Sequence, residues 1–369
     1  MESMNLRSKT FCILPWIEKF QNVDGKRYLC CHSAVPINPN ESDHIRTKIA
    51  NQEPVPHCES CYKLDQQRTI SPRLQETGRW LKKTQVKSYI EQWKPGDPDR
   101  TFFYDLRFTN KCNLACITCA PGSSSLWAKE LGISIKNQNQ LEFDKFDLAE
   151  FINANADIIG DSKIYMAGGE PLIIDQCIEL LKQVADMECQ PEIVINTNLT
   201  RVDPDMQLVL KRIKNLTLVV SVDAHDRVNE YHRWPIKWEK FVKNLSWTND
   251  IDCTVQFNTV IDAVSIMNAA NLVDLESHCD LWNLTILTKP KELLINNLPE
   301  HARGQVRESW EKIKSSKFFT TDPVFKSRVI HAAALLDQPG SSESLANFIA
   351  TLDRRRNINH QDFLPIKLT

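Results

Sequence analysis

Six short apolar segments alternate with helical segments between residues 101 and 290. Because parallel strands need crossover connections, and those crossovers are right-handed, this alternation predicts a parallel sheet made of βαβ units. An open doubly wound sheet and a partial barrel both satisfy the pattern, and both place ligands at the carboxyl ends of the strands. The predicted strands are 101–109, 162–170, 192–198, 216–224, 252–261 and 281–287.

The flanking regions divide the chain further. Residues 1–75 are rich in Pro, Asn and Cys and show little periodicity, which predicts a small domain held by a metal rather than by its own core. A helix predicted over 76–94 and the turn "PGDPD" form a linker over 76–100. The βα repeat then occupies 101–290, and a mostly helical extension follows over 291–369.

Charge and cysteine content restrict the class of protein. The net charge of −2 gives no basic field, so nucleic acid is not expected as a partner. The chain shows neither a secretory signal pattern nor an apolar run of membrane-spanning length, which predicts a cytoplasmic protein with no membrane partner. Twelve cysteines in such a chain indicate metal binding or chemistry rather than disulfides.

Three cysteines lie close together just after the first predicted strand. Cys112, Cys116 and Cys119 form the pattern CxxxCxxC in "CNLACITC". Thiolates select zinc, Cu(I) or iron–sulfur clusters. Structural zinc normally takes four protein ligands, and no fourth Cys or His lies nearby in the sequence. A cubane cluster held by three cysteines leaves its fourth iron open to a small molecule.

This loop resembles that of the radical SAM superfamily. The stretch "YMAGGEP" (165–171), at the end of the second predicted strand, resembles the GGE motif of the same family. The resemblance implies an α/β fold with a partial (β/α)6 TIM-type barrel. It also implies a [4Fe–4S] cluster on the three cysteines, with S-adenosylmethionine (SAM) bound at the open iron. Thr118 departs from the family, which often has an aromatic residue before the third cysteine.

The resemblance also implies a set of SAM-binding residues at the strand ends. The glycine backbone and Glu170 would hold the amino group, and Arg233 would pair with the carboxylate in a bidentate manner. Asp223 would bind the nucleoside or simply cap the turn that follows it. The implied cofactor-binding residues are Gly168, Gly169, Glu170, Asn198, Ser221, Asp223, Arg233 and Asn258.

A second cysteine group lies in the N-terminal region. Cys12, Cys30, Cys58 and Cys61 have the chemistry for either zinc or a complete iron–sulfur cluster. Their pattern resembles the SPASM auxiliary-cluster module or its shorter twitch form, here preceding the βα repeat. The resemblance implies one auxiliary [4Fe–4S] cluster, with zinc as the alternative. Cys31 can replace Cys30 as a ligand.

The resemblance implies an enzyme that reductively cleaves SAM to a 5'-deoxyadenosyl radical, which abstracts a hydrogen atom from a peptide or protein. A flavodoxin or ferredoxin would supply the electron. The alternatives are the same chemistry on a small metabolite or nucleoside, and a non-catalytic metal-binding interaction protein. The sequence assigns no further catalytic residue. It favours a solvated helix edge for 230–234 and a helix C-terminus for 353–356.

Overall fold

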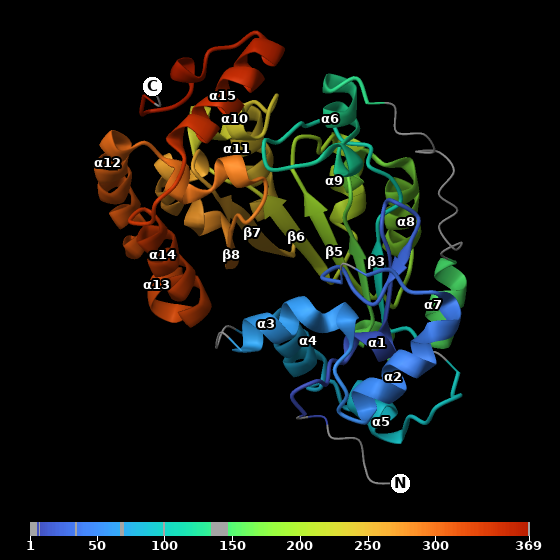
Figure 1. Ribbon diagram of the computed structural model, residues 1–369. Coiled ribbons are helices and arrows are strands. Elements are labelled where there is room, and N and C mark those ends of the chain that lie inside the picture. The colour runs from blue at the N-terminus through green and yellow to red at the C-terminus, as the bar shows by residue number, and fades with distance from the viewer. Residues whose placement is uncertain are drawn as a thin grey trace. The chain divides into compact units, whose positions relative to one another are not determined.

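The computed structural model describes residues 6, 8–33, 35–66, 70–98, 100–133 and 147–367. It has an α/β fold with an eight-stranded, mostly parallel sheet in the order β2-β1-β3-β4-β5-β6-β7-β8 (Figure 1). Strands β3 to β8 are the six strands predicted from the sequence, so the predicted α/β class is confirmed. Two compact units divide the chain. One comprises Met1–Thr109, Asn137–Gly168 and Glu179–Val194, and the other Asn110–Lys136, Gly169–Ile178 and Ile195–Thr369. The division into four segments that the sequence indicates stays a prediction.

Among the described residues, four strands lie wholly in the first unit. They are β1 (Glu18–Gln21), β2 (Arg27–Tyr28), β3 (Phe103–Leu106) and β4 (Lys163–Met166). β1 and β4 pair parallel to β3, while β2 lies antiparallel on β1. The sequence did not reveal β1 or β2, because the local pattern "EKFQ" has no strand periodicity and the strand depends on its pairing with β3.

Short helices complete this unit. They are α1 (Leu14–Ile17), α2 (Ser42–Ala50), α3 (Glu59–Gln66), α4 (Pro72–Trp80), α5 (Thr84–Gln92) and α7 (Leu148–Ala154). The single helix predicted over 76–94 is therefore two helices. The break falls at 81–83, where Lys83 has an extended backbone. α4 begins earlier than predicted because Ser71 accepts the Leu74 N–H and Pro72 suits the first helical position.

The N-terminal region has a hydrophobic core of its own elements and β3. Trp16 meets Trp93 edge-on with ring centroids 5.5 Å apart, and Trp80 stacks on Phe103 at 5.9 Å. Cys12 belongs to this buried cluster. The expectation that residues 1–75 lack a hydrophobic core is therefore wrong, while a metal in this region stays a prediction. The aromatic residues of this core are far apart in the sequence, so local periodicity could not predict that they pack together.

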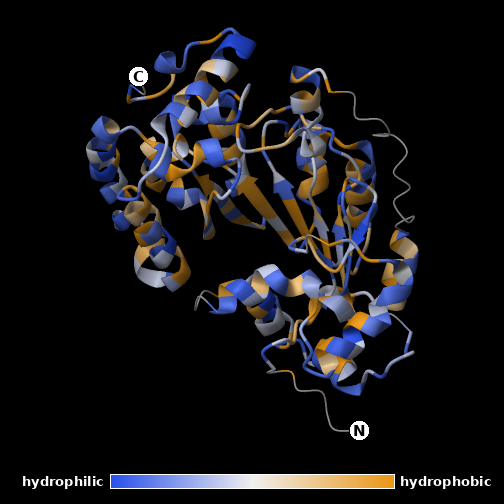
Figure 2. Cartoon of the chain, in the orientation of Figure 1, coloured by the Kyte–Doolittle hydropathy of each residue, from blue (hydrophilic) through white to orange (hydrophobic). Residues whose placement is uncertain are grey.

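The second unit holds the strands that carry most of the predicted site. The end of β5 (Glu192–Thr197) belongs to this unit, which begins again at Ile195. β6 (Leu216–Ser221), β7 (Cys253–Ile261) and β8 (Leu281–Ile286) follow and pair in parallel. Ser221, the last residue of β6, pairs in register with Asn258, and Asn258 pairs with Asn283, so a row of polar residues crosses these three strands. Figure 2 shows these strands as largely hydrophobic and the helices as mixed.

The remaining helices follow in chain order, and the last four form the C-terminal extension. They are α6 (Ser125–Glu130), α8 (Asp175–Ala185), α9 (Pro204–Leu210), α10 (Asp226–His232), α11 (Trp238–Trp247), α12 (Glu300–Trp310), α13 (Lys317–Thr321), α14 (Pro323–Leu335) and α15 (Ser342–Arg356). Residues Ala269–His278 form a 3₁₀ helix between β7 and β8. Within the residues that the structure describes, no helix is both long enough and apolar enough to cross a membrane.

Candidate cofactor site

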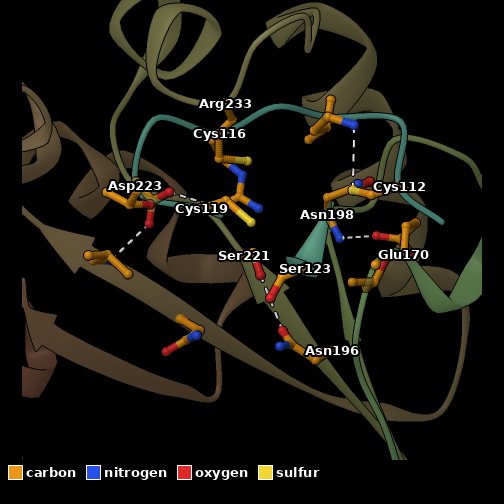
Figure 3. Close-up of a pocket in the computed structure, with 16 residues that line it drawn as sticks. Cys112, Cys116, Cys119, Ser123, Glu170, Asn196, Asn198, Ser221, Asp223 and Arg233 are labelled. Atoms are coloured by element: carbon orange, nitrogen blue, oxygen red, sulfur yellow. Dashed lines mark hydrogen bonds and ion pairs between the residues drawn. The ribbon is translucent and has the colours of Figure 1, made fainter. Parts of the chain in front are cut away.

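The three loop cysteines and most of the predicted SAM-binding residues line one pocket of about 240 Å³ in the second unit (Figure 3). Among the three loop cysteines and the predicted SAM-binding residues, Gly168 alone does not line this pocket. Leu114, Thr118, Ser123, Asn196, Thr197 and Val260 also contribute, although they were not among the predicted ligands. The predicted residues that line the pocket are Cys112, Cys116, Cys119, Gly169, Glu170, Asn198, Ser221, Asp223, Arg233 and Asn258.

The start of α6 shapes the cysteine loop. The Cys112 N–H donates to Ser125 Oγ at 3.0 Å. Ser124 caps α6 by accepting the Trp127 N–H, and its own hydroxyl donates to the Leu114 carbonyl at 2.6 Å. The Trp127 indole N–H donates to the Cys116 carbonyl at 2.6 Å. The serines and the tryptophan that follow the cysteines in the sequence therefore fold the loop back on itself.

The donor set of the loop fits a cluster better than a single ion. Among the residues placed in the structure, no three His, Cys, Asp or Glu side chains lie close enough to share one metal ion. Thiolates on a cubane need not converge on one atom, because each binds a different iron. Burial raises the pKa of the Cys112 thiol to about 12 and that of Cys119 to about 11. Metal binding must therefore displace protons from these thiols.

The glycine turn after β4 packs directly on the start of the cysteine loop. Gly169 has φ +57°, and a Cβ at this position would lie 2.2 Å from the Lys111 carbonyl oxygen. That oxygen accepts the Glu170 N–H at 2.9 Å. Only glycine fits here, because both the backbone conformation and the close approach exclude a side chain. Gly168, with φ +78°, makes the same turn possible.

Glu170 is buried and organises the end of β5. Its Oε1 accepts hydrogen bonds from the Leu172 N–H at 3.1 Å and the Thr197 hydroxyl at 2.7 Å, and its Oε2 accepts the Asn198 N–H at 2.6 Å. Burial raises the pKa of Glu170, and these hydrogen bonds and the charge of Arg233 oppose the rise. A carboxylate has about four acceptor positions, so one remains beside the pocket.

Asn198 connects the end of β5 to the cysteine loop. Its Nδ2 donates to Asn113 Oδ1 at 3.0 Å, and its Oδ1 accepts from the N–H and the hydroxyl of Thr200 at 3.0 and 2.6 Å. Ser221 donates its hydroxyl to Asn196 Oδ1 at 3.2 Å on the neighbouring strands. Hydrogen bonds therefore fix these polar side chains before any ligand is bound.

A buried group of charges forms part of the pocket wall. Arg233 Nη1 donates to Asp223 Oδ2 at 2.7 Å, while Asp223 Oδ1 accepts the Val260 N–H at 2.8 Å. Burial alone would raise the pKa of Asp223, but the charges of Arg233 and His232 hold it well below its usual range. Both oxygens of Asp223 have protein partners. Its geometry therefore supports a role in orienting Arg233, which Figure 3 shows beside Cys116 and Cys119.

His232 extends this charge group. Its Nε2 lies 2.5 Å from Asp262 Oδ2, and its Nδ1 lies 3.1 Å from Asp223 Oδ2, out of line for a hydrogen bond. Burial alone would lower the pKa of His232, but Asp262 and Asp223 raise it to about 10. The burial of α10 also corrects an expectation from the sequence, because the solvated helix edge predicted for residues 230–234 is wrong. Tyr231 and His232 are fully buried, since α10 packs against the cysteine loop through the His232 carbonyl.

The N-terminal cysteines line a separate cavity inside the first unit. Cys12 lies just before α1, Cys30 follows β2, Cys58 ends the 3₁₀ helix Pro56–Cys58, and Cys61 lies in α3. Burial raises the pKa of Cys58 to about 11 and those of Cys12 and Cys30 well above their usual value. The cavity measures about 10 Å³, room for one water, so the thiols must separate to admit a cluster.

Comparison with known proteins assigns the class. Residues 106–280 match the family model described as the Radical SAM superfamily. Residues 106–280 are therefore a radical SAM domain, and members of that superfamily are enzymes. A 96-residue stretch is 29% identical to the GTP 3',8-cyclase of Mycolicibacterium smegmatis and covers 26% of this chain and 24% of that protein. The chain thus matches about a quarter of that relative's length.

Solved structures give a weaker likeness. Streptococcus suis SuiB bound to S-adenosylmethionine is 15% identical, with a TM-score of 0.40, over 78% of this chain and 69% of that chain. SuiB bound to precursor peptide SuiA is 14% identical, with a TM-score of 0.38, over 80% and 65%. Similarity at this level assigns neither a substrate nor a partner to this chain.

Proposed function

We propose that the chain binds a [4Fe–4S] cluster at Cys112, Cys116 and Cys119 and SAM beside it, and acts by hydrogen-atom abstraction. When bound, the cluster and SAM supply a reductively generated 5'-deoxyadenosyl radical. The observation that supports this proposal is the single pocket shared by the three thiols, the glycine turn and the polar strand ends. A flavodoxin or ferredoxin as electron donor belongs to the same proposal.

The residues of the pocket have distinct parts in this proposal. The remaining acceptor position of Glu170 suits the ammonium group of an amino acid. Arg233 is held by Asp223 through Nη1, which leaves the rest of its guanidinium for a carboxylate. The amide and hydroxyl groups of Asn196, Ser221 and Asn258 suit hydrogen bonding to an uncharged polar group.

The test is SAM cleavage by the anaerobically reconstituted protein. With dithionite, the wild-type chain should form 5'-deoxyadenosine and methionine. Cys116→Ala should abolish this, because Cys116 is a proposed cluster ligand. Cys189→Ala is the matched control, since Cys189 is exposed and lies outside both cysteine groups. Cleavage that persists in Cys116→Ala would refute the ligand assignment.

We also propose an auxiliary [4Fe–4S] cluster on Cys12, Cys30, Cys58 and Cys61. All four line one cavity, and none of the described cysteines converges in threes on a point that would suit a single zinc ion. The wild-type chain should then hold about eight irons and Cys58→Ala about four, because each cluster contains four. Zinc in place of half the iron would refute this cluster.

The substrate is proposed to be a peptide or protein, on the resemblance of the N-terminal cysteine pattern to twitch and SPASM modules. Polypeptides from source cells grown on deuterated amino acids should transfer deuterium into 5'-deoxyadenosine. The small-molecule fraction of the same extract is the matched comparison. Transfer from that fraction alone would favour the metabolite or nucleoside alternative.

A further inference from the structure

The last residue of α15 reaches the cysteine loop. Arg356 Nη2 donates to the Ala115 carbonyl at 2.7 Å, although the two residues lie 241 positions apart in sequence. Its side chain is 1% exposed, and its Nε donates to Glu130 at 3.0 Å. The guanidinium also lies 5.1 Å from the Trp127 ring centroid and 5.9 Å from that of Trp234. A buried ion pair between aromatic rings holds this arginine in one geometry.

The contact holds one of the two peptide groups that flank Cys116, and other residues hold the second. The Ala115 carbonyl belongs to the peptide plane that precedes Cys116, and Arg356 holds that plane. The following plane is held twice, by Trp127 on the Cys116 carbonyl and by the His232 carbonyl on the Ile117 N–H. Two fixed peptide planes leave the backbone of Cys116 with a single conformation.

The same helix also holds α10. Asp353 Oδ1 accepts the Tyr231 hydroxyl at 2.9 Å, and Asp353 Oδ2 accepts the His360 N–H at 2.9 Å. Tyr231 lies two residues before Arg233, so α15 contacts both segments that shape the pocket. This helix lies beyond residues 106–280, the part of the chain that matches the family. The helical extension therefore contacts the cysteine loop and α10 directly.

We propose that Arg356 is a positioning residue for the cluster-binding loop, and that the C-terminal extension is a working part of the cofactor site. Only the iron measurement below depends on the proposed function, because it assumes that the three loop cysteines bind a cluster. The geometry of the loop itself is tested separately, so failure of one does not imply failure of the other.

The experiment compares Arg356→Gln with Arg354→Gln in the full-length reconstituted chain. Arg354 is the matched control, because it lies on the same helix, is exposed, and donates its Nε to the Ala350 carbonyl of that helix. Amide hydrogen exchange over residues 112–120 should be about tenfold faster in Arg356→Gln, the change expected from losing a charged hydrogen bond. Exchange over β6 should not change. Iron release from the loop cluster to a chelator should accelerate in parallel.

Two results would overturn the proposal. The first is loop exchange in Arg356→Gln within twofold of the control. The second is faster exchange spread equally over the loop and β6, because that would reflect a general loss of stability. Arg356→Lys adds a further check. It keeps the charge but not the planar fork, so the electron paramagnetic resonance signal of the reduced loop cluster should still differ from wild type. Unaltered loop exchange with unchanged signal in this variant would also overturn the proposal.

Discussion

Gly169→Ala tests whether the glycine turn and the cysteine loop depend on each other. The new Cβ would lie 2.2 Å from the Lys111 carbonyl oxygen, whereas a carbon–oxygen contact needs about 3.3 Å. One of the two segments must therefore move by about 1 Å. Lys111 directly precedes Cys112, so the movement reaches the proposed cluster ligands as well as Glu170.

The energetic cost can be worked from the same geometry. A non-glycine residue at positive φ costs about 1–2 kcal/mol. Overpacking against backbone costs about 1–3 kcal/mol. The lower entropy of alanine in the unfolded chain offsets about 0.4–1 kcal/mol. Gly169→Ala should therefore lower the free energy of unfolding by about 1–5 kcal/mol.

The assay is urea denaturation with iron counted on the reconstituted protein. Gly122→Ala is the matched control, because Gly122 lies just after the cysteine loop and its Cβ would meet no atom within 4 Å. The control should change stability by less than about 0.5 kcal/mol and keep its iron. Gly169→Ala should lose stability and loop iron together. Equal behaviour of the two variants would refute the close-approach argument.

Three further changes have defined outcomes. Glu170→Gln should weaken SAM binding and cost about 1–3 kcal/mol, measured by calorimetry and denaturation, since an amide cannot accept at both ends. His232→Gln should flatten the pH dependence of stability. The folded pKa of about 10 exceeds the unfolded value, so wild type is stabilised fully below about pH 6.5 and loses this as pH rises toward 10. The free energy of unfolding is measured by denaturation at several pH values. The same change of this free energy with pH in both proteins would contradict the prediction. Arg73→Gln should lower the melting temperature and the iron at the N-terminal cysteines, because Arg73 donates to the Phe11 carbonyl beside Cys12 and pairs with Asp65.

The sequence was sufficient for the repeating elements and for the donor atoms of the pocket. Strand periodicity located β3 to β8, since alternation of apolar segments is a local property. The spacing CxxxCxxC and the GGE turn named residues that the structure brings to one pocket. Ser341, a residue type that favours helix N-caps, caps α15 by accepting the Ser344 N–H.

The tertiary structure decided how those residues are held. β1 forms because it pairs with β3, and the N-terminal core forms from aromatic residues of four separate segments. His232 is charged because Asp262, thirty positions away, lies against it. The sequence predicted only that Arg356 lies at the end of a helix. In the fold its guanidinium donates a hydrogen bond to the carbonyl of Ala115, the residue before Cys116. Local pattern determines which groups are available, and only long-range packing determines which buried charge meets which partner.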